Sequence, residues 1–166
     1  MTTATETLSK FHDLLTRFDT GMLITHTGNN SLHARPMAVA QVEENCDLWF
    51  ITSTESPKAM EIRTNDEVLV TFQNKRSEFV SLSGRAEVVR DPQKLAMLWQ
   101  EPFKVWFPEG QQDSSIVLLH VSGRQGEFWD NSGLNKASFA LESLRAYLTG
   151  TRPQAREGVQ HGRLEM

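Results

Sequence analysis

The sequence predicts a mainly β protein of the α+β type, an antiparallel β-barrel with flanking helices. Seven short runs are rich in β-branched and aromatic residues and are bounded by turn signals. Only hairpins or short helices separate these runs, whereas a parallel sheet would need a long helical crossover after nearly every strand. The 166 residues, 39% of them hydrophobic, suffice for one domain with its own core and are too few for two.

A helix opens the predicted fold. Apolar side chains between residues 7 and 18 recur at spacings of three and four, which places them on one helical face. The pattern then changes to β-rich runs at 22–26 and 32–42, separated by the turn signal at 27–30. These two runs predict a hairpin, and a third strand is expected at 48–52.

The middle of the chain returns to helical signals and then to strands. Ser56 is a suitable N-cap and Pro57 a suitable first helical residue, so a short helix is expected after the third strand. Runs at 67–72 and 78–89 predict a second hairpin, with a bend at Gly84.

The last third of the chain predicts two helices and two strands. These elements are a helix that begins at Asp91-Pro92 and is interrupted at Pro102, strands at 116–121 and 126–130, and a final helix over 139–148. The sequence therefore predicts one domain over residues 1–150, followed by a polar tail over residues 151–166.

Composition and missing motifs exclude several function classes. The formal net charge of −4 argues against nucleic acid as the main partner. The single cysteine, Cys46, excludes an internal disulfide framework, and the five scattered histidines have no ligand spacing, so no metal site is expected. Hydrolase, zinc-protease and nucleotide-loop motifs are absent. Neither a signal peptide nor an apolar run of about 18 residues is present, which predicts a cytoplasmic protein without a membrane partner.

The most informative stretch runs from Thr52 to Lys58, where a strand ends and a helix begins. Helix N-termini carry unpaired N–H groups and a partial positive charge that suit phosphate, and Ser56 and Lys58 add a hydroxyl and an ammonium. The alternative is an ordinary serine cap beside a solvated lysine. Arg35 adds a second cation, next to Pro36, which predicts an irregular strand of the kind that borders binding sites. The alternative for Arg35 is a surface position on an edge strand.

A family resemblance covers nearly the whole chain, through segments whose order is more specific than any one of them. They are the first helix, Leu32-His33-Ala34-Arg35-Pro36-Met37, Leu48-Trp49-Phe50-Ile51-Thr52-Ser53, Ser56-Pro57-Lys58, Ser83-Gly84-Arg85-Ala86, Asp91-Pro92, Trp106-Phe107-Pro108-Glu109-Gly110, Ile116-Val117-Leu118-Leu119 and Glu127-Phe128-Trp129-Asp130. In this order they resemble the FMN-binding split-barrel proteins related to pyridoxamine 5′-phosphate oxidase, and most of all the general stress protein branch.

The resemblance implies a split barrel of the FMN-binding type and a homodimer with FMN sites between its subunits. Carried over position by position, Arg35, Ser56 and Lys58 would hold the FMN phosphate, with Pro57 in the same segment, while Pro36, Met37, Ile51 and Thr52 would lie along the isoalloxazine and ribityl chain. The implied function is a flavin-dependent oxidoreductase that acts on a small substrate or a reduced nicotinamide nucleotide.

Other interpretations stay open at the level of sequence. The protein could be a non-catalytic FMN-binding or sensing protein of a stress response, or the same barrel with a deazaflavin, haem or no ligand. No residue stands out as a general acid or base. In the family the partner subunit contributes aromatic surface near the flavin, which Trp129 could supply. For Trp106 and Trp129 we favour an ordinary place in the barrel or dimer core.

The chain departs from the oxidase itself at the substrate positions. Ala40 stands where the oxidase has a lysine for the substrate phosphate, and Pro57 stands where it has a second basic residue. Residues 99–103 lack its Tyr-Arg-Ser set, and the chain ends without its Arg-Leu-His segment. The comparison with the family therefore predicts that this protein is not an efficient pyridoxine phosphate oxidase.

Overall fold

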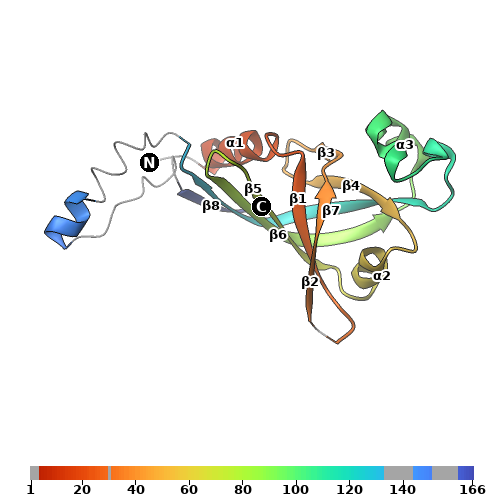
Figure 1. Ribbon diagram of the computed structural model, residues 1–166, viewed down its shortest axis with the longest axis horizontal. Helices are drawn as coiled ribbons and strands as arrows, with labels where there is room; N and C mark the ends of the chain where they lie inside the picture. Colours follow the sequence, from red (N-terminus) through yellow and green to blue (C-terminus); the bar gives the residue numbers. More distant parts are fainter. Residues whose placement is uncertain (1–3, 30, 133–143, 151–160) are drawn as a thin grey trace.

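The computed structural model describes residues 4–29, 31–132, 144–150 and 161–166. In this part of the chain, eight strands form one sheet in the order β2-β1-β5-β6-β7-β4-β3, with β8 paired to β7 (Figure 1). Every strand pair is antiparallel, as predicted. The strands are β1 (Thr20–His26), β2 (Leu32–Ala38), β3 (Gln41–Val42), β4 (Leu48–Ser53), β5 (Glu67–Gln73), β6 (Glu78–Val89), β7 (Ile116–Asp130) and β8 (His161–Glu165).

Short helices lie between and beside the strands. They are α1 (Ala4–Leu15), α2 (Pro57–Thr64), α3 (Pro92–Leu98), and the 3₁₀ helices η1 (Glu101–Val105) and η2 (Gly110–Gln112). The predicted first helix begins three residues earlier than expected, at Ala4, and its apolar face is buried in the main core. None of the helices in the described residues is both long enough and apolar enough to cross a membrane.

The sheet curls into a half-barrel because its two end strands follow each other in the chain. Only Val39 and Ala40 separate β2 from β3, yet these strands occupy opposite ends of the sheet. The Val39 N–H donates to Asp19 O at 2.9 Å, and the Ala40 N–H donates to Trp49 O at 2.8 Å. This short connection brings the two ends together and gives the split-barrel shape that the sequence predicts.

The predicted run 32–42 is therefore two strands, not one. Pro36 lies in β2, which is an end strand of the sheet, and the β1–β2 register is continuous through the Met22–Pro36 pair. The expected backbone irregularity at Pro36 is absent from this pairing. An end strand needs hydrogen bonds on one side only, so it tolerates the missing N–H.

The predicted strands at 116–121 and 126–130 are one strand, β7. Its polar middle is typical of a turn, but β6 pairs with β7 from Leu118 to Asp130, and a register shift at Ser83/Gly84 absorbs the irregularity. A Cβ atom at Gly84 would lie 2.0 Å from the Ser122 carbonyl oxygen, so this close approach of two strands requires glycine. The predicted bend at Gly84 is confirmed in this form.

The C-terminal segment differs most from the prediction. Residues 161–165, predicted as part of a polar tail, form β8 and pair with β7, and Leu164 packs against the main core. The final predicted helix is observed at 144–149, where its apolar side chains are exposed, and the earlier part of that prediction lies outside the described residues.

In the described part of the chain, two apolar clusters lie on opposite faces of β4. Phe50 belongs to the main cluster inside the half-barrel, together with residues from α1. The next residue, Ile51, belongs to a second cluster with Leu95 and Leu98 of α3 and Phe103 of η1. Because successive side chains of a strand point to opposite faces, β4 is covered on both sides. Its C-terminal end leads directly into α2 and the candidate site.

Candidate functional site

The start of α2 has the cap that the sequence predicts. Ser56 has extended backbone, and its hydroxyl accepts a hydrogen bond from the Ala59 N–H at 3.4 Å, while Pro57 takes the first helical position. The Thr52 hydroxyl, at the end of β4, lies 3.3 Å from the Ser56 hydroxyl. These contacts join the strand end to the helix start and hold two hydroxyl groups at one point.

Arg35 reaches this helix from β2. It is paired with Leu23, a buried residue of β1, so its side chain points to the interior face of the sheet. Its Nη1 donates to Thr25 Oγ1 at 2.5 Å and its Nη2 donates to Glu61 Oε2 at 2.7 Å. The Arg35 side chain is only 15% exposed. Arg35 does lie on an end strand, as the alternative interpretation has it, but its side chain is mostly buried and paired and so is not at the surface.

Lys58 is half-buried beside Arg35. Burial lowers the pKa of the Lys58 ammonium, the positive charge of Arg35 lowers it further, and Glu61 acts in the opposite direction. The charge of Arg35 acts on Lys58 and its guanidinium contacts Glu61 of the same helix, so the expected meeting of Arg35 with the start of α2 is found. The alternative of a solvated lysine does not describe this side chain.

The donor set at this point suits a phosphate group. Arg35 and Lys58 offer charged donors, and Ser56 and Thr52 offer hydroxyls. Pro57 lacks an N–H and the Ala59 N–H is held by Ser56, so the first turn can present the backbone N–H of Lys58. Charge-assisted hydrogen bonds of this kind contribute roughly 1.5–3 kcal/mol each. We call Arg35, Thr52, Ser56 and Lys58 the phosphate cradle.

The other predicted cofactor residues are more dispersed. Pro36 is exposed and Pro57 is exposed, whereas Met37 and Ile51 are each 8% exposed and lie in the two different apolar clusters. The structure thus brings together the residues expected around the phosphate and divides the side chains expected along the flavin ring.

Sequence reasoning overlooked the polar partners of the cradle. Glu61 contacts Arg35, Thr25 and also His33, whose Nδ1 lies 3.3 Å from Glu61 Oε1. Burial alone would raise the pKa of the Glu61 carboxyl, but these hydrogen bonds and the charge of Arg35 hold it below its usual value. The i, i+3 spacing of Lys58 and Glu61 was a local signal for one helix face.

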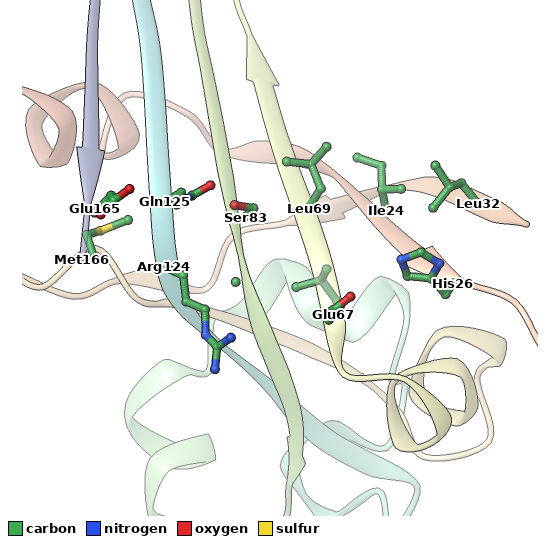
Figure 2. A pocket seen from close by; sticks show the side chains of 12 residues that line it. Ile24, His26, Leu32, Glu67, Leu69, Ser83, Arg124, Gln125, Glu165 and Met166 are labelled. Atoms are coloured by element: carbon green, nitrogen blue, oxygen red, sulfur yellow. The ribbon is translucent and has the colours of Figure 1, made fainter. Parts of the chain in front are cut away.

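A broad hollow of about 750 Å³ lies on the outer face of the sheet (Figure 2). Ile24 and Leu69 form a cross-strand pair in it, and Leu32 at its edge is 68% exposed. His26 also lines the hollow, and its buried Nδ1 has no hydrogen-bond partner among the described residues. The charged residues Glu67, Arg124 and Glu165 also line the hollow, and apolar side chains on adjacent strands beside such polar residues are typical of an interaction surface.

Trp106 and Trp129 do not lie in the barrel core. Trp106 is 75% exposed in the segment after η1, and Trp129 is 38% exposed on β7. His161 of β8 stacks on Trp129 with ring centroids 5.4 Å apart, and its Nε2 lies 2.8 Å from Glu127 Oε1. The expectation of a barrel-core tryptophan is therefore wrong for both residues, and a place at a dimer interface stays a prediction.

One side-chain cluster and the single cysteine concern metal binding and thiol reactivity. Glu43, Asp47 and His120 have potential metal-ligand atoms within 4.8 Å of one another, a grouping invisible in the sequence. The Lys94 ammonium already lies 3.0 Å from the Glu43 carboxylate and packs over the Trp49 ring. Cys46 is fully buried, and burial raises the pKa of its thiol to about 11, in agreement with an unreactive cysteine.

Solved structures with the same fold support the split-barrel assignment. A general stress protein 26 from Jannaschia sp. CCS1 is 21% identical, with a TM-score of 0.73 over 99% of this chain and all of its own. A general stress FMN/FAD binding protein from Xanthomonas citri is 28% identical, with a TM-score of 0.67 over 79% of this chain and 93% of its own.

Sequence comparisons lead to the same family. Protein bli-3 of Neurospora crassa is 31% identical over an alignment of 100 positions. The match covers 54% of this chain, and the chain spans about half (48%) of that relative's length. The family model described as pyridoxamine 5′-phosphate oxidase like matches residues 6–154. The chain therefore belongs to the pyridoxamine 5′-phosphate oxidase-like family.

Proposed function

We propose that this protein is a cytoplasmic, homodimeric FMN-binding oxidoreductase that acts on a small substrate or a reduced nicotinamide nucleotide. One observation carries the proposal: Arg35 of β2 contacts Glu61 of α2 and lies close enough to Lys58, just after the Ser56 cap, to lower the pKa of its ammonium, in a chain of a flavin-associated family. The Xanthomonas citri protein, which is described as binding FMN or FAD, supports the choice of a flavin.

The cradle would bind the phosphate and orient the rest of the cofactor. Arg35 and Lys58 would pair with the phosphate oxygens, and the Thr52 and Ser56 hydroxyls would complete the hydrogen bonds at the strand end. Bound FMN supplies the chemistry of electron and hydride transfer. The protein's part is to fix the position of the cofactor and to limit its contact with water.

The proposal predicts that the purified protein binds FMN much more tightly than riboflavin. Riboflavin lacks the phosphate and so loses several charge-assisted hydrogen bonds, which corresponds to a loss of at least about a hundredfold in affinity. Fluorescence titration of the apoprotein with both flavins measures the ratio, and the visible spectrum identifies the flavin. Equal affinities would contradict the phosphate assignment.

The second part of the proposal is that another copy of this chain covers the outer sheet face. Ile24, Leu32 and Leu69 are apolar side chains around the hollow of Figure 2. Burying them against the same face of a partner removes apolar surface from water, which is the main driving force of association. Leu69→Arg is expected to convert a dimer to a monomer, because it would place two guanidinium groups in that interface.

Light scattering at micromolar concentration measures this change. Arg76→Leu, at an exposed position in the β5–β6 turn, is a control for altered surface charge and should leave the mass unchanged. A monomeric wild-type protein would exclude flavin sites that are shared between subunits.

The FMN-loaded protein is also expected to be a poor pyridoxine phosphate oxidase. Ala40 replaces the lysine that helps hold the substrate phosphate in the oxidase, and residues 99–103 lack its Tyr-Arg-Ser substrate set. Each lost contact to the anionic substrate weakens binding by roughly 1.5–3 kcal/mol. An oxygen-coupled assay with pyridoxine phosphate measures this, and a parallel assay follows oxidation of reduced nicotinamide nucleotides. Rapid formation of pyridoxal phosphate would contradict the prediction. Failure to oxidise any nicotinamide nucleotide would favour a non-catalytic FMN-binding role.

A further inference from the structure

A carboxylate lies beside the phosphate cradle, although a phosphate site needs no carboxylate for direct contact. Glu61 is only 14% exposed, and it lies one helical turn after Lys58 on α2. Its Oε2 accepts hydrogen bonds from Thr25 at 2.5 Å and from Arg35 at 2.7 Å. A negative charge this close to the two cations would repel the two negative charges of a bound phosphate.

The same contacts hold Arg35 in place. A free arginine side chain has about 2 kcal/mol of rotamer entropy, much of which is lost when it binds an anion. Thr25 and Glu61 engage one N–H group each on Nη1 and Nη2, so the guanidinium is already oriented and still has further N–H groups for a ligand. Glu61 thus pre-orients the principal cation of the cradle.

We infer that Glu61 is a positioning residue for the phosphate site. Its carboxylate Oε2 orients Arg35, and its negative charge lowers the affinity for phosphate. This inference rests on the proposed function, since it assigns the phosphate of FMN to the cradle. The length and the charge of the Glu61 side chain can be changed separately by substitution. Two conservative variants, one that alters each property, should therefore change FMN binding in opposite directions.

Glu61→Gln retains the length of the side chain and an oxygen that can accept from Arg35, but it removes the charge. It is expected to tighten FMN binding by at least about threefold, because the repulsion of the phosphate is lost. Glu61→Asp retains the charge but is shorter by one methylene group, so it cannot hold Arg35 in the same place. It is expected to weaken FMN binding by at least about fivefold, because positioning is lost while repulsion remains.

Titration with riboflavin separates these effects from a structural role. Both variants should bind riboflavin within about twofold of the wild type, because it has no phosphate for the cradle to recognise. Glu44→Gln, an exposed position at the far end of β4 from α2, makes the same charge change as Glu61→Gln and should leave both affinities unchanged. Thermal midpoints are measured for every variant, and Glu61→Gln decides the outcome if Glu61→Asp does not fold.

The possible results are distinguishable. Opposite shifts in the FMN-to-riboflavin affinity ratio support the inference. If the wild type prefers FMN but neither variant changes the ratio, or if FMN and riboflavin shift together, Glu61 has no positioning role. If Glu61→Gln weakens FMN binding as much as Glu61→Asp, the inference that the negative charge of Glu61 lowers phosphate affinity is wrong. A wild-type protein that binds FMN no better than riboflavin overturns the proposed function itself.

Discussion

Lys58→Ala is expected to weaken FMN binding by at least about tenfold, while the apoprotein stays folded. A tenfold loss requires about 1.4 kcal/mol, less than one charge-assisted hydrogen bond is usually worth. The lysine is half-buried next to Arg35, where burial and the neighbouring charge lower the pKa of its ammonium. The negative charge of a bound phosphate would raise the pKa of Lys58 again, so the charged form of the lysine is more stable in the FMN-bound protein than in the empty one.

The same reasoning predicts the pH dependence of binding. Because phosphate raises the pKa of Lys58 above its lowered value in the empty protein, FMN binding takes up a proton as pH rises through that lowered value. Affinity should therefore fall with increasing pH in the alkaline range, and Lys58→Ala should remove this component. Flavin fluorescence titrations across pH measure both effects.

Lys75→Ala is the matched control for Lys58→Ala. Lys75 is exposed in the turn between β5 and β6, so its removal changes the net charge equally without touching the cradle. It should leave FMN affinity within about twofold of the wild type, because an exposed charge is screened by solvent and salt. If Lys58→Ala reduced the stability of the apoprotein by as much free energy as it reduced FMN binding, Lys58 would be a structural residue.

Gly84→Ala is expected to be the most destabilising small substitution in the sheet, at about 3 kcal/mol. The added Cβ atom would lie 2.0 Å from the carbonyl oxygen of Ser122 on the neighbouring strand. A backbone atom cannot rotate away as a side chain can, so β6 and β7 would have to separate where the register shifts. At this chain length the loss corresponds to a fall of roughly 6–12 °C in thermal midpoint.

Gly28→Ala tests the same chemical change where space is available. Among the described residues, and apart from its two chain neighbours, no atom lies within 4 Å of a Cβ atom at Gly28, so the thermal midpoint of the variant should be nearly that of the wild type. Circular dichroism melts of the two variants measure the difference. A Gly84→Ala protein that melts within about 2 °C of the wild type would show that the bulge has an inexpensive alternative geometry.

The sequence by itself determined the features that depend on neighbours along the chain. The N-cap at Ser56 with Pro57 behind it needs only the residues of one helical turn, and it is present as predicted. The alternation of buried and exposed side chains along β5 likewise follows from the period of a strand. The convergence of Arg35 with Lys58 was expected from the family resemblance.

Only the tertiary structure decided which distant residues meet. The polar sequence at 161–165 forms β8 because β7 offers it hydrogen-bond partners. The order of residues within the segment does not indicate that β7 lies beside it. Similarly, the middle of β7 stays extended because β6 pairs along it.

The pairing of Arg35 with Glu61 joins residues 26 positions apart, and that of Asp47 with His120 joins residues 73 positions apart. Such contacts depend on how the sheet curls and on which helix covers which end of it, so no local pattern specifies them. The cradle's cations could therefore be predicted from the chain and its relatives, whereas the carboxylate that orients one of them became visible only in the fold.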